Sequence, residues 1–173
     1  MTFIRRMLAA TLIATATTSS AWAQGGMAAA LTAVDSAELH AKDTLAAGAG
    51  LVEPGAAQAL TEAGRETVEW LAALGAPFDR DADGGFVVSL EAAHSVARVA
   101  RVGGDGAGRA ILSAVVAAVR AETMIEVGED ARLKGLSQDE AGRVVGAVVE
   151  RGGRPVEITA TAVVLATGGA GGL

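Results

Sequence analysis

Cysteine is absent from this chain of 173 residues, which excludes disulfides, thiolate metal ligands and cysteine nucleophiles. The only two histidines, His40 and His94, are too few for a histidine-based metal site unless carboxylates complete it, so we expect no metal. The formal net charge of −6 argues against nucleic acid as a partner, because phosphate binding needs clustered lysine and arginine. No apolar run reaches the roughly 20 residues of a membrane-spanning helix, so no membrane partner is expected.

Hydrophobic residues make up 51% of the chain, although aromatic residues account for only 3% and tyrosine is missing. Alanine, valine and glycine therefore dominate the apolar positions. This composition is typical of α/β proteins, in which buried strands carry small apolar side chains and glycine allows close approach. The length gives room for one domain.

Three helices are predicted, over about 36–50, 54–75 and 109–120. The first begins at a capping box, Asp35-Ser36-Ala37-Glu38, in which the Asp35 carboxylate caps the first turn. In the second, Pro54 suits the first turn and Gly75 suits the C-terminal end. The apolar positions that carry the helical pattern there are Leu60, Val68, Leu71 and Leu74.

Strands are predicted at 86–90 and 124–127, and a hairpin is predicted across 143–160 around Gly152-Gly153. A fully apolar strand is expected at 162–167, followed by a glycine turn. The acidic stretch 79–85 is interpreted as a turn, because it lacks the spacing of a calcium-binding loop.

The N-terminal region has two interpretations. Arg5 and Arg6 precede a short apolar stretch at 8–16, and Ala21-Trp22-Ala23 has the form of a signal-peptidase site, so residues 1–23 resemble a secretory signal. Alternatively, Gly25 and Gly26 form a turn that lets the backbone approach a cofactor. We treat 1–18 as a signal-like segment and 19–173 as the domain.

The candidate chemistry lies in "LEAAHSVAR", where Glu91, His94 and Arg98 fall within eight positions. A carboxylate, an imidazole and a guanidinium can bind a charged substrate and move its protons. The alternative is a solvated loop or a set of surface ion pairs. The glycine turn at 104–108 does not follow the G-x-G-x-x-G pattern, so the pyrophosphate site of a complete Rossmann fold is not found.

Several stretches carry a family resemblance: "SSAWAQGGMAAAL", "ELHAKDTLAAGAGL", "LEAAHSVARV", "GGDGAGRAI" and "AVVLATGGAGGL". In this order and spacing the chain resembles the L-aspartate oxidase family, within the succinate dehydrogenase and fumarate reductase flavoproteins. The resemblance implies an α/β fold. It implies an incomplete FAD-binding Rossmann-like domain with a small β-hairpin, lacking the N-terminal dinucleotide motif and the capping domain.

The resemblance also implies site residues. Glu91 is expected near the substrate amine, with His94 and Ser95 shaping the same loop, and Arg98 completes the predicted catalytic set. FAD is the expected cofactor. The residues expected to wrap it are Ser19, Ser20, Ala21, Trp22, Ala23, Gln24, Gly25 and Gly26, and those expected to pass under it are Thr167, Gly168 and Gly169.

The implied reaction oxidises L-aspartate to iminoaspartate in the cytoplasm, with hydride transfer to the flavin, and feeds quinolinate and NAD synthesis. Departures from the family pattern at Val96-Ala97, Arg101 and Ala107 leave open a fumarate reductase-type flavoprotein acting on another dicarboxylate. An exported, non-enzymatic binding protein is a third alternative. We expect the chain by itself to be marginally stable and inactive without the remainder of the enzyme, which is its expected partner.

Overall fold

The computed structural model describes residues 19–104 and 106–166. They fall into two compact units, 19–118 and 119–166, which are described separately here. The segment 1–18 and the predicted flavin residues Thr167, Gly168 and Gly169 lie outside the described residues. Within the described part of the chain, no helix is both long and apolar enough to cross a membrane.

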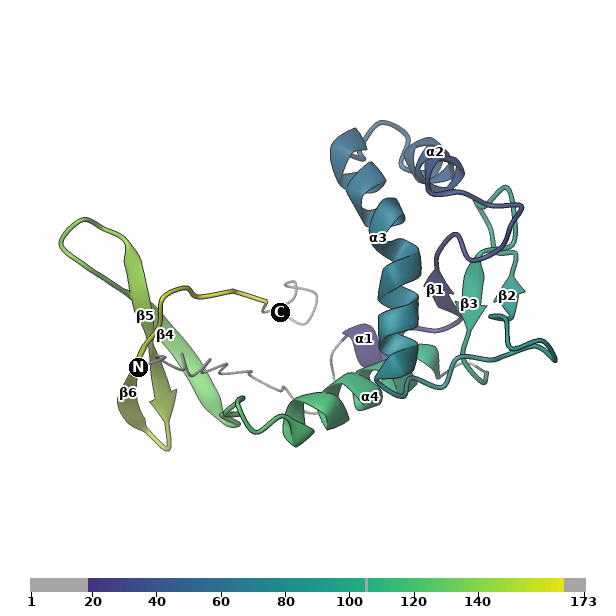
Figure 1. Cartoon of the computed structure of the whole chain (residues 1–173). Helices are drawn as coiled ribbons and strands as arrows, with labels where there is room; N and C mark the ends of the chain where they lie inside the picture. The colour runs from purple at the N-terminus through teal and green to yellow at the C-terminus, as the bar shows by residue number, and fades with distance from the viewer. Residues whose placement is uncertain (1–18, 105, 167–173) are drawn as a thin grey trace, which may run out of the picture. The chain divides into compact units, whose positions relative to one another are not determined.

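The first unit contains a small antiparallel sheet of order β1-β3-β2, shown in Figure 1. Its strands are β1 (Gly26–Ala28), β2 (Val88–Ser89) and β3 (Val99–Arg101). Ala100 at the centre of β3 is the register partner of Met27 in β1 and of Val88 in β2, and it is fully buried. Only β2 falls within a predicted strand. Strands of two or three residues are too short to show an alternating pattern.

All three predicted helices are confirmed, and a short helix at the start of the first described range is added (Figure 1). The N-cap prediction is wrong. Ser36 is the N-cap residue, and its hydroxyl accepts a hydrogen bond from the Leu39 amide at 3.1 Å. The Asp35 carboxylate instead accepts hydrogen bonds from Arg98. The helices are α1 (Ser19–Trp22), α2 (Ala37–Ala47), α3 (Pro54–Ala73) and α4 (Ala107–Ala121).

The core of this unit forms where α3 packs against the sheet. Val68 and Leu71 of α3 lie in one buried cluster with Ala29, Ala100 and Phe78. Leu60 carries part of the predicted helical pattern but lies outside this core, because it is 75% exposed. The buried residues of α3 recur every three or four positions from Ala57 through Thr61, Gly64, Val68 and Leu71. Leu60 lies three positions after Ala57 and four before Gly64, which places it about 60° from the centre of that stripe, at its edge.

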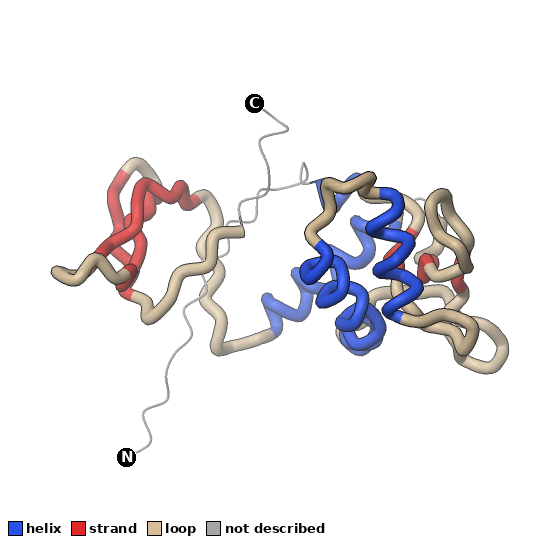
Figure 2. Tube along the Cα trace, turned by 90° about the horizontal axis from the view of Figure 1, so that it is seen from above, coloured by secondary structure: helices blue, strands red, loops and turns tan. Residues whose placement is uncertain are grey.

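The second unit is an antiparallel sheet of order β4-β5-β6, formed by β4 (Ala131–Gln138), β5 (Val144–Arg151) and β6 (Arg154–Thr159). Figure 2 shows these strands in red. The predicted hairpin is confirmed as β5 and β6. Gly152 and Gly153 join them with φ values of 57° and 74°, as a two-residue hairpin turn with both residues left-handed requires.

Two strand predictions in this region are wrong. Residues 124–127 lie in a turn and an extended loop, and the strand begins at Ala131 instead. Residues 162–166 form no strand, although they are apolar. An apolar run becomes a strand only where a neighbour supplies hydrogen-bond partners, and none of the described strands pairs with this one.

Candidate functional site

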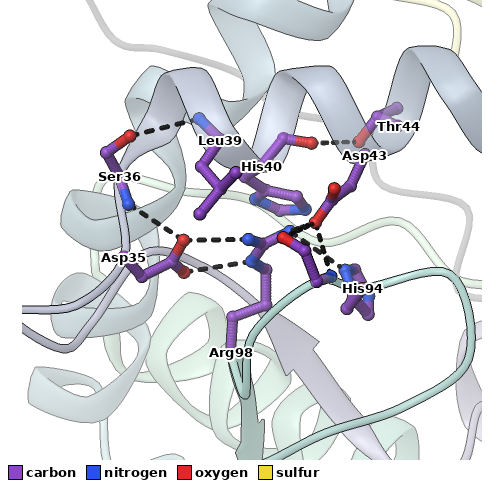
Figure 3. A network of polar contacts seen from close by, with 9 residues as sticks. Asp35, Ser36, Leu39, His40, Asp43, Thr44, His94 and Arg98 are labelled. Carbon is purple, nitrogen blue, oxygen red and sulfur yellow. Dashed lines mark hydrogen bonds and ion pairs between the residues drawn. The ribbon is translucent and has the colours of Figure 1, made fainter.

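A fully buried arginine lies at the centre of the candidate site (Figure 3). The Arg98 Nε and Nη2 donate to the two carboxylate oxygens of Asp35 at 3.0 and 2.9 Å, and Nη1 donates to Asp43 Oδ2 at 2.6 Å. The side chains of Arg98 and Asp35 are both 0% exposed. A buried charge is costly unless it is paired, and a forked arginine–carboxylate pair is the strongest such arrangement.

Local sequence brings these three residues together from distant segments. Arg98 directly precedes β3, and its backbone bonds to both neighbouring segments of the sheet, donating to Ser89 at 3.1 Å and accepting from Ala29 at 3.0 Å. Asp35 directly precedes the N-cap of α2, and Asp43 lies on α2 itself. The network therefore ties α2 to the sheet.

Asp43 also anchors the loop that precedes β3. Its Oδ2 atom accepts hydrogen bonds from the backbone amide of Ser95 at 2.8 Å and from the Ser95 hydroxyl at 2.7 Å. These two bonds, together with the Arg98 guanidinium, lower the pKa of Asp43 to about 2. For Arg98, burial opposes the charged form, but the bonds to Asp35 and Asp43 outweigh it and raise the pKa further.

Both histidines of the chain join this network. Arg98 Nη1 lies 3.2 Å from His94 Nδ1, and the rings of His40 and His94 meet edge to face with centroids 5.6 Å apart. His40 is buried, and its Nδ1 atom has no hydrogen-bond partner among the described residues. Burial, and then the positive charge of Arg98, lower the pKa of His40.

The Glu91 side chain lies at the turn of the predicted flavin-wrapping segment. A Cβ atom added to Gly25, whose φ is +82°, would lie 2.8 Å from Glu91 Oε1. The Glu91 carboxylate is exposed and makes no ion pair or hydrogen bond to another described residue. Its backbone oxygen accepts from the His94 amide at 3.3 Å, and Ala93 between them is left-handed with φ +70°.

The three predicted catalytic side chains thus have different neighbours, although Glu91 and His94 share one turn. His94 and Arg98 contact each other, whereas the Glu91 side chain approaches Gly25. The alternative of surface ion pairs is wrong for Arg98, which is buried. All three of its guanidinium nitrogens already have partners, so its direct contact with a substrate stays a prediction. Sequence analysis named Ser95 only as part of the His94 loop, and it missed three other members of the network: Asp35, His40 and Asp43. His40 and Asp43 show the i, i+3 spacing of one helix face.

The segment expected to wrap the flavin has a surface that suits a flat ring system. Trp22 is 66% exposed, and the two residues that follow it, Ala23 and Gln24, are also exposed. The segment rests on the start of α4, where the Gly108 amide donates to Ala23 at 3.0 Å. A Cβ atom on Gly108 would collide with the backbone of Ser20, so only glycine permits this approach. Small side chains and an uncovered aromatic ring therefore fit FAD here.

Metal binding receives no support from the part of the chain that the structure describes. No group of three or more carboxylates and histidines there could hold a metal ion. In the stretch 79–85, Asp81 Oδ1 accepts from the amides of Asp83 and Gly85 at 3.0 and 2.7 Å, which makes it the turn that the sequence predicted.

Comparison with known proteins places this geometry in a family. The FAD binding domain family matches residues 4–173. L-aspartate oxidase from Caulobacter vibrioides is 67% identical over 155 residues, which are 90% of this chain and 30% of that enzyme. The L-aspartate oxidase of Agrobacterium fabrum is 42% identical over 156 residues, with the same coverage of both. The chain therefore spans about 30% of the length of these curated relatives.

Solved structures agree with the sequence comparison. A quinol fumarate reductase from E. coli superposes with a TM-score of 0.80 at 29% identity, covering 88% of this chain and 26% of that one. The Mycobacterium smegmatis Sdh1 complex in its apo form gives 0.75 at 30% identity, covering 87% of this chain and 28% of that one. The family match begins inside the segment 1–18, so the boundary at residue 18 stays a prediction. The chain belongs to the FAD binding domain family, with FAD as its cofactor, and is homologous over nine-tenths of its length to L-aspartate oxidases.

Proposed function

We propose that this chain is the part of an FAD-dependent L-aspartate oxidase that wraps the flavin and supplies the glutamate for the substrate amine. The observation that carries the proposal is the approach of the Glu91 carboxylate to the Gly25 turn, between residues far apart in sequence. The 67% identity to the Caulobacter vibrioides enzyme supports it. The product would be iminoaspartate, a precursor for quinolinate and NAD synthesis in the cytoplasm.

FAD, when bound, supplies the two-electron acceptor for the hydride that leaves the substrate Cα. The residues that would hold it are those of the segment 19–26, with Thr167, Gly168 and Gly169 as further predicted contacts. Glycine at 26 lets this segment pack against β3, because a Cβ atom there would collide with the Ala100 carbonyl. Trp22 offers an exposed ring. The hydrogen bond from Gly108 holds the segment against α4.

Glu91 would bind the substrate through charge. Its carboxylate is exposed and has no partner among the described residues, so it is available to an ammonium group. A carboxylate beside the amine fixes the orientation of the Cα–H bond. This role requires a substrate that carries an amine, and that requirement distinguishes aspartate from succinate.

The test is a chimera in which residues 19–173 replace the homologous segment of the Caulobacter vibrioides enzyme. Under anaerobic conditions, we expect aspartate to bleach the flavin absorbance, whereas succinate leaves it unchanged. Glu91→Gln should slow bleaching by about 100-fold. Glu66→Gln, at an exposed residue of α3, is the matched control. A chimera that binds FAD but ignores aspartate would overturn the proposal.

A fumarate reductase-type function on another dicarboxylate is the second candidate. The TM-score of 0.80 against quinol fumarate reductase favours it, as do Arg101 and Ala107, where the sequence departs from the oxidase pattern. In the same chimera, bleaching by succinate and not by aspartate would select this candidate. If the chain is instead an exported binding protein, neither aspartate nor succinate would bleach the flavin. The exported protein would then begin at Gln24 after signal cleavage.

A further inference from the structure

We propose that Arg98 is a positioning residue that holds His94 as the Nε2–H tautomer, so that His94 presents a hydrogen-bond donor to a carboxylate of the substrate. The substrate half of this inference rests on the proposed function. The tautomer half rests only on the contacts around the two residues.

The Arg98 guanidinium is held in place by contacts other than the one with His94. Asp35 holds two of its nitrogens at 3.0 and 2.9 Å, and Asp43 holds the third at 2.6 Å. All of these groups are buried or nearly so, since the Asp43 side chain is 13% exposed. The guanidinium therefore cannot rotate away from His94 without breaking an ion pair.

The tautomer follows from the chemistry of the donor. A guanidinium carries only N–H donors and no acceptor, so the 3.2 Å contact requires His94 Nδ1 to accept. A neutral imidazole with an accepting Nδ1 carries its proton on Nε2. His94 then cannot act as a base through Nδ1, and its other nitrogen is a donor.

The ring of His94 is also held from other sides. The edge of the His40 ring meets it at an angle of 64°, and Ser95, the next residue, is anchored twice to Asp43. His94 Nε2 has no hydrogen bond to another residue in the described ranges. The donor is thus oriented but free to take a ligand.

Glu91 and His94 lie on the same turn, joined by the hydrogen bond from the His94 amide to the Glu91 carbonyl at 3.3 Å. One end of the turn offers a carboxylate and the other an N–H donor. An α-amino dicarboxylate has an ammonium group and carboxylates to match both. Ala93 between them is left-handed, with φ +70°.

Side-chain nitrogen NMR of the two histidines in the whole 173-residue chain tests the tautomer. We expect the His94 Nδ1 signal in the unprotonated region and Nε2 in the protonated region at neutral pH, with His40→Gln used for assignment. Arg98→Met should return His94 to the tautomer mixture of free imidazole, whereas Arg101→Met, on an exposed side chain, should not. A protonated Nδ1 in the unsubstituted chain overturns the proposal, even if Arg98→Met fails to fold.

Kinetics in the chimera test the substrate half. His94→Leu removes the donor and should raise KM for aspartate about tenfold or more with a smaller change in kcat. His94→Gln, which keeps an N–H donor, should recover part of that loss. An unchanged KM in His94→Leu would overturn the contact with the substrate while leaving the tautomer result intact. Failure of the unsubstituted chimera to oxidise aspartate would count against the proposed function and not against the NMR result.

Discussion

At the scale of single residues, Asp43 makes stability depend on pH. Its pKa falls from 3.8 to about 2 because Ser95 and Arg98 bind the charged form. The folded state therefore releases this proton more readily than the unfolded state does. The stabilisation is complete above about pH 4 and is lost as the pH falls through about 2.

Asp43→Asn should accordingly flatten the loss of stability between pH 4 and pH 2. The measurement is the urea midpoint as a function of pH for both proteins. Asp83→Asn is the matched control, because Asp83 is exposed and its carboxylate binds no described residue. An identical pH dependence in Asp43→Asn and the unsubstituted chain would contradict the assignment.

Arg98→Met tests the buried ion pair. The substitution leaves Asp35 buried without its partner, so we expect a loss of about 3–5 kcal/mol in the free energy of unfolding. The control Arg101→Met removes a cation that is 52% exposed and 3.9 Å from Asp79, and should cost less than about 1 kcal/mol. Denaturant unfolding measures both. Equal losses in the two variants would show that the pair at Arg98 is not buried as described.

Ala93 is strained in the left-handed region at φ +70°. Glycine accepts that conformation without the Cβ clash but loses more entropy on folding, so Ala93→Gly should raise stability by up to about 1 kcal/mol. The neighbouring Ala92 is not left-handed, and Ala92→Gly should lower stability by about 0.5–1 kcal/mol. Opposite signs in thermal unfolding are the expected result, and a loss in both variants would exclude strain at Ala93.

At the scale of elements, the hairpin of β5 and β6 depends on its turn. Gly153→Ala places a Cβ on a residue with φ 74°, at a cost of about 1 kcal/mol. Amide hydrogen exchange in β5 and β6 should therefore accelerate. Gly128→Ala, at a glycine with open space around it and no positive φ, should leave exchange unchanged. Unaltered exchange in Gly153→Ala would mean that another turn closes the hairpin.

The elements also differ in how well sequence predicts them. The helices α2, α3 and α4 follow from capping residues, Pro54 and glycine loops, which act within a few residues. The strands β1 and β3 have no such local signal, because their pairing partners lie far away in sequence. Leu60 illustrates a related limit of sequence analysis. The helical pattern of apolar residues predicts α3, but it does not say which of those residues the rest of the fold covers.

At the scale of the whole molecule, the chain covers about 30% of the L-aspartate oxidases that it matches. We predict that the purified 173-residue chain does not reduce added FAD in the presence of aspartate, because it corresponds to only about 30% of the length of those oxidases. Anaerobic absorbance at the flavin band measures this, with the chimera as positive control. Aspartate-dependent bleaching by the chain alone would refute the prediction.

The sequence by itself determined the helices and the hairpin, because caps and turns act locally, and its resemblance to the L-aspartate oxidase family implied FAD. It also indicated Glu91, His94 and Arg98 as chemically important. Only the tertiary structure decided that Arg98 is buried between Asp35 and Asp43, and that Glu91 lies at Gly25. Those contacts join residues more than 50 positions apart, and their formation depends on how α2 and the sheet pack, which no local pattern encodes.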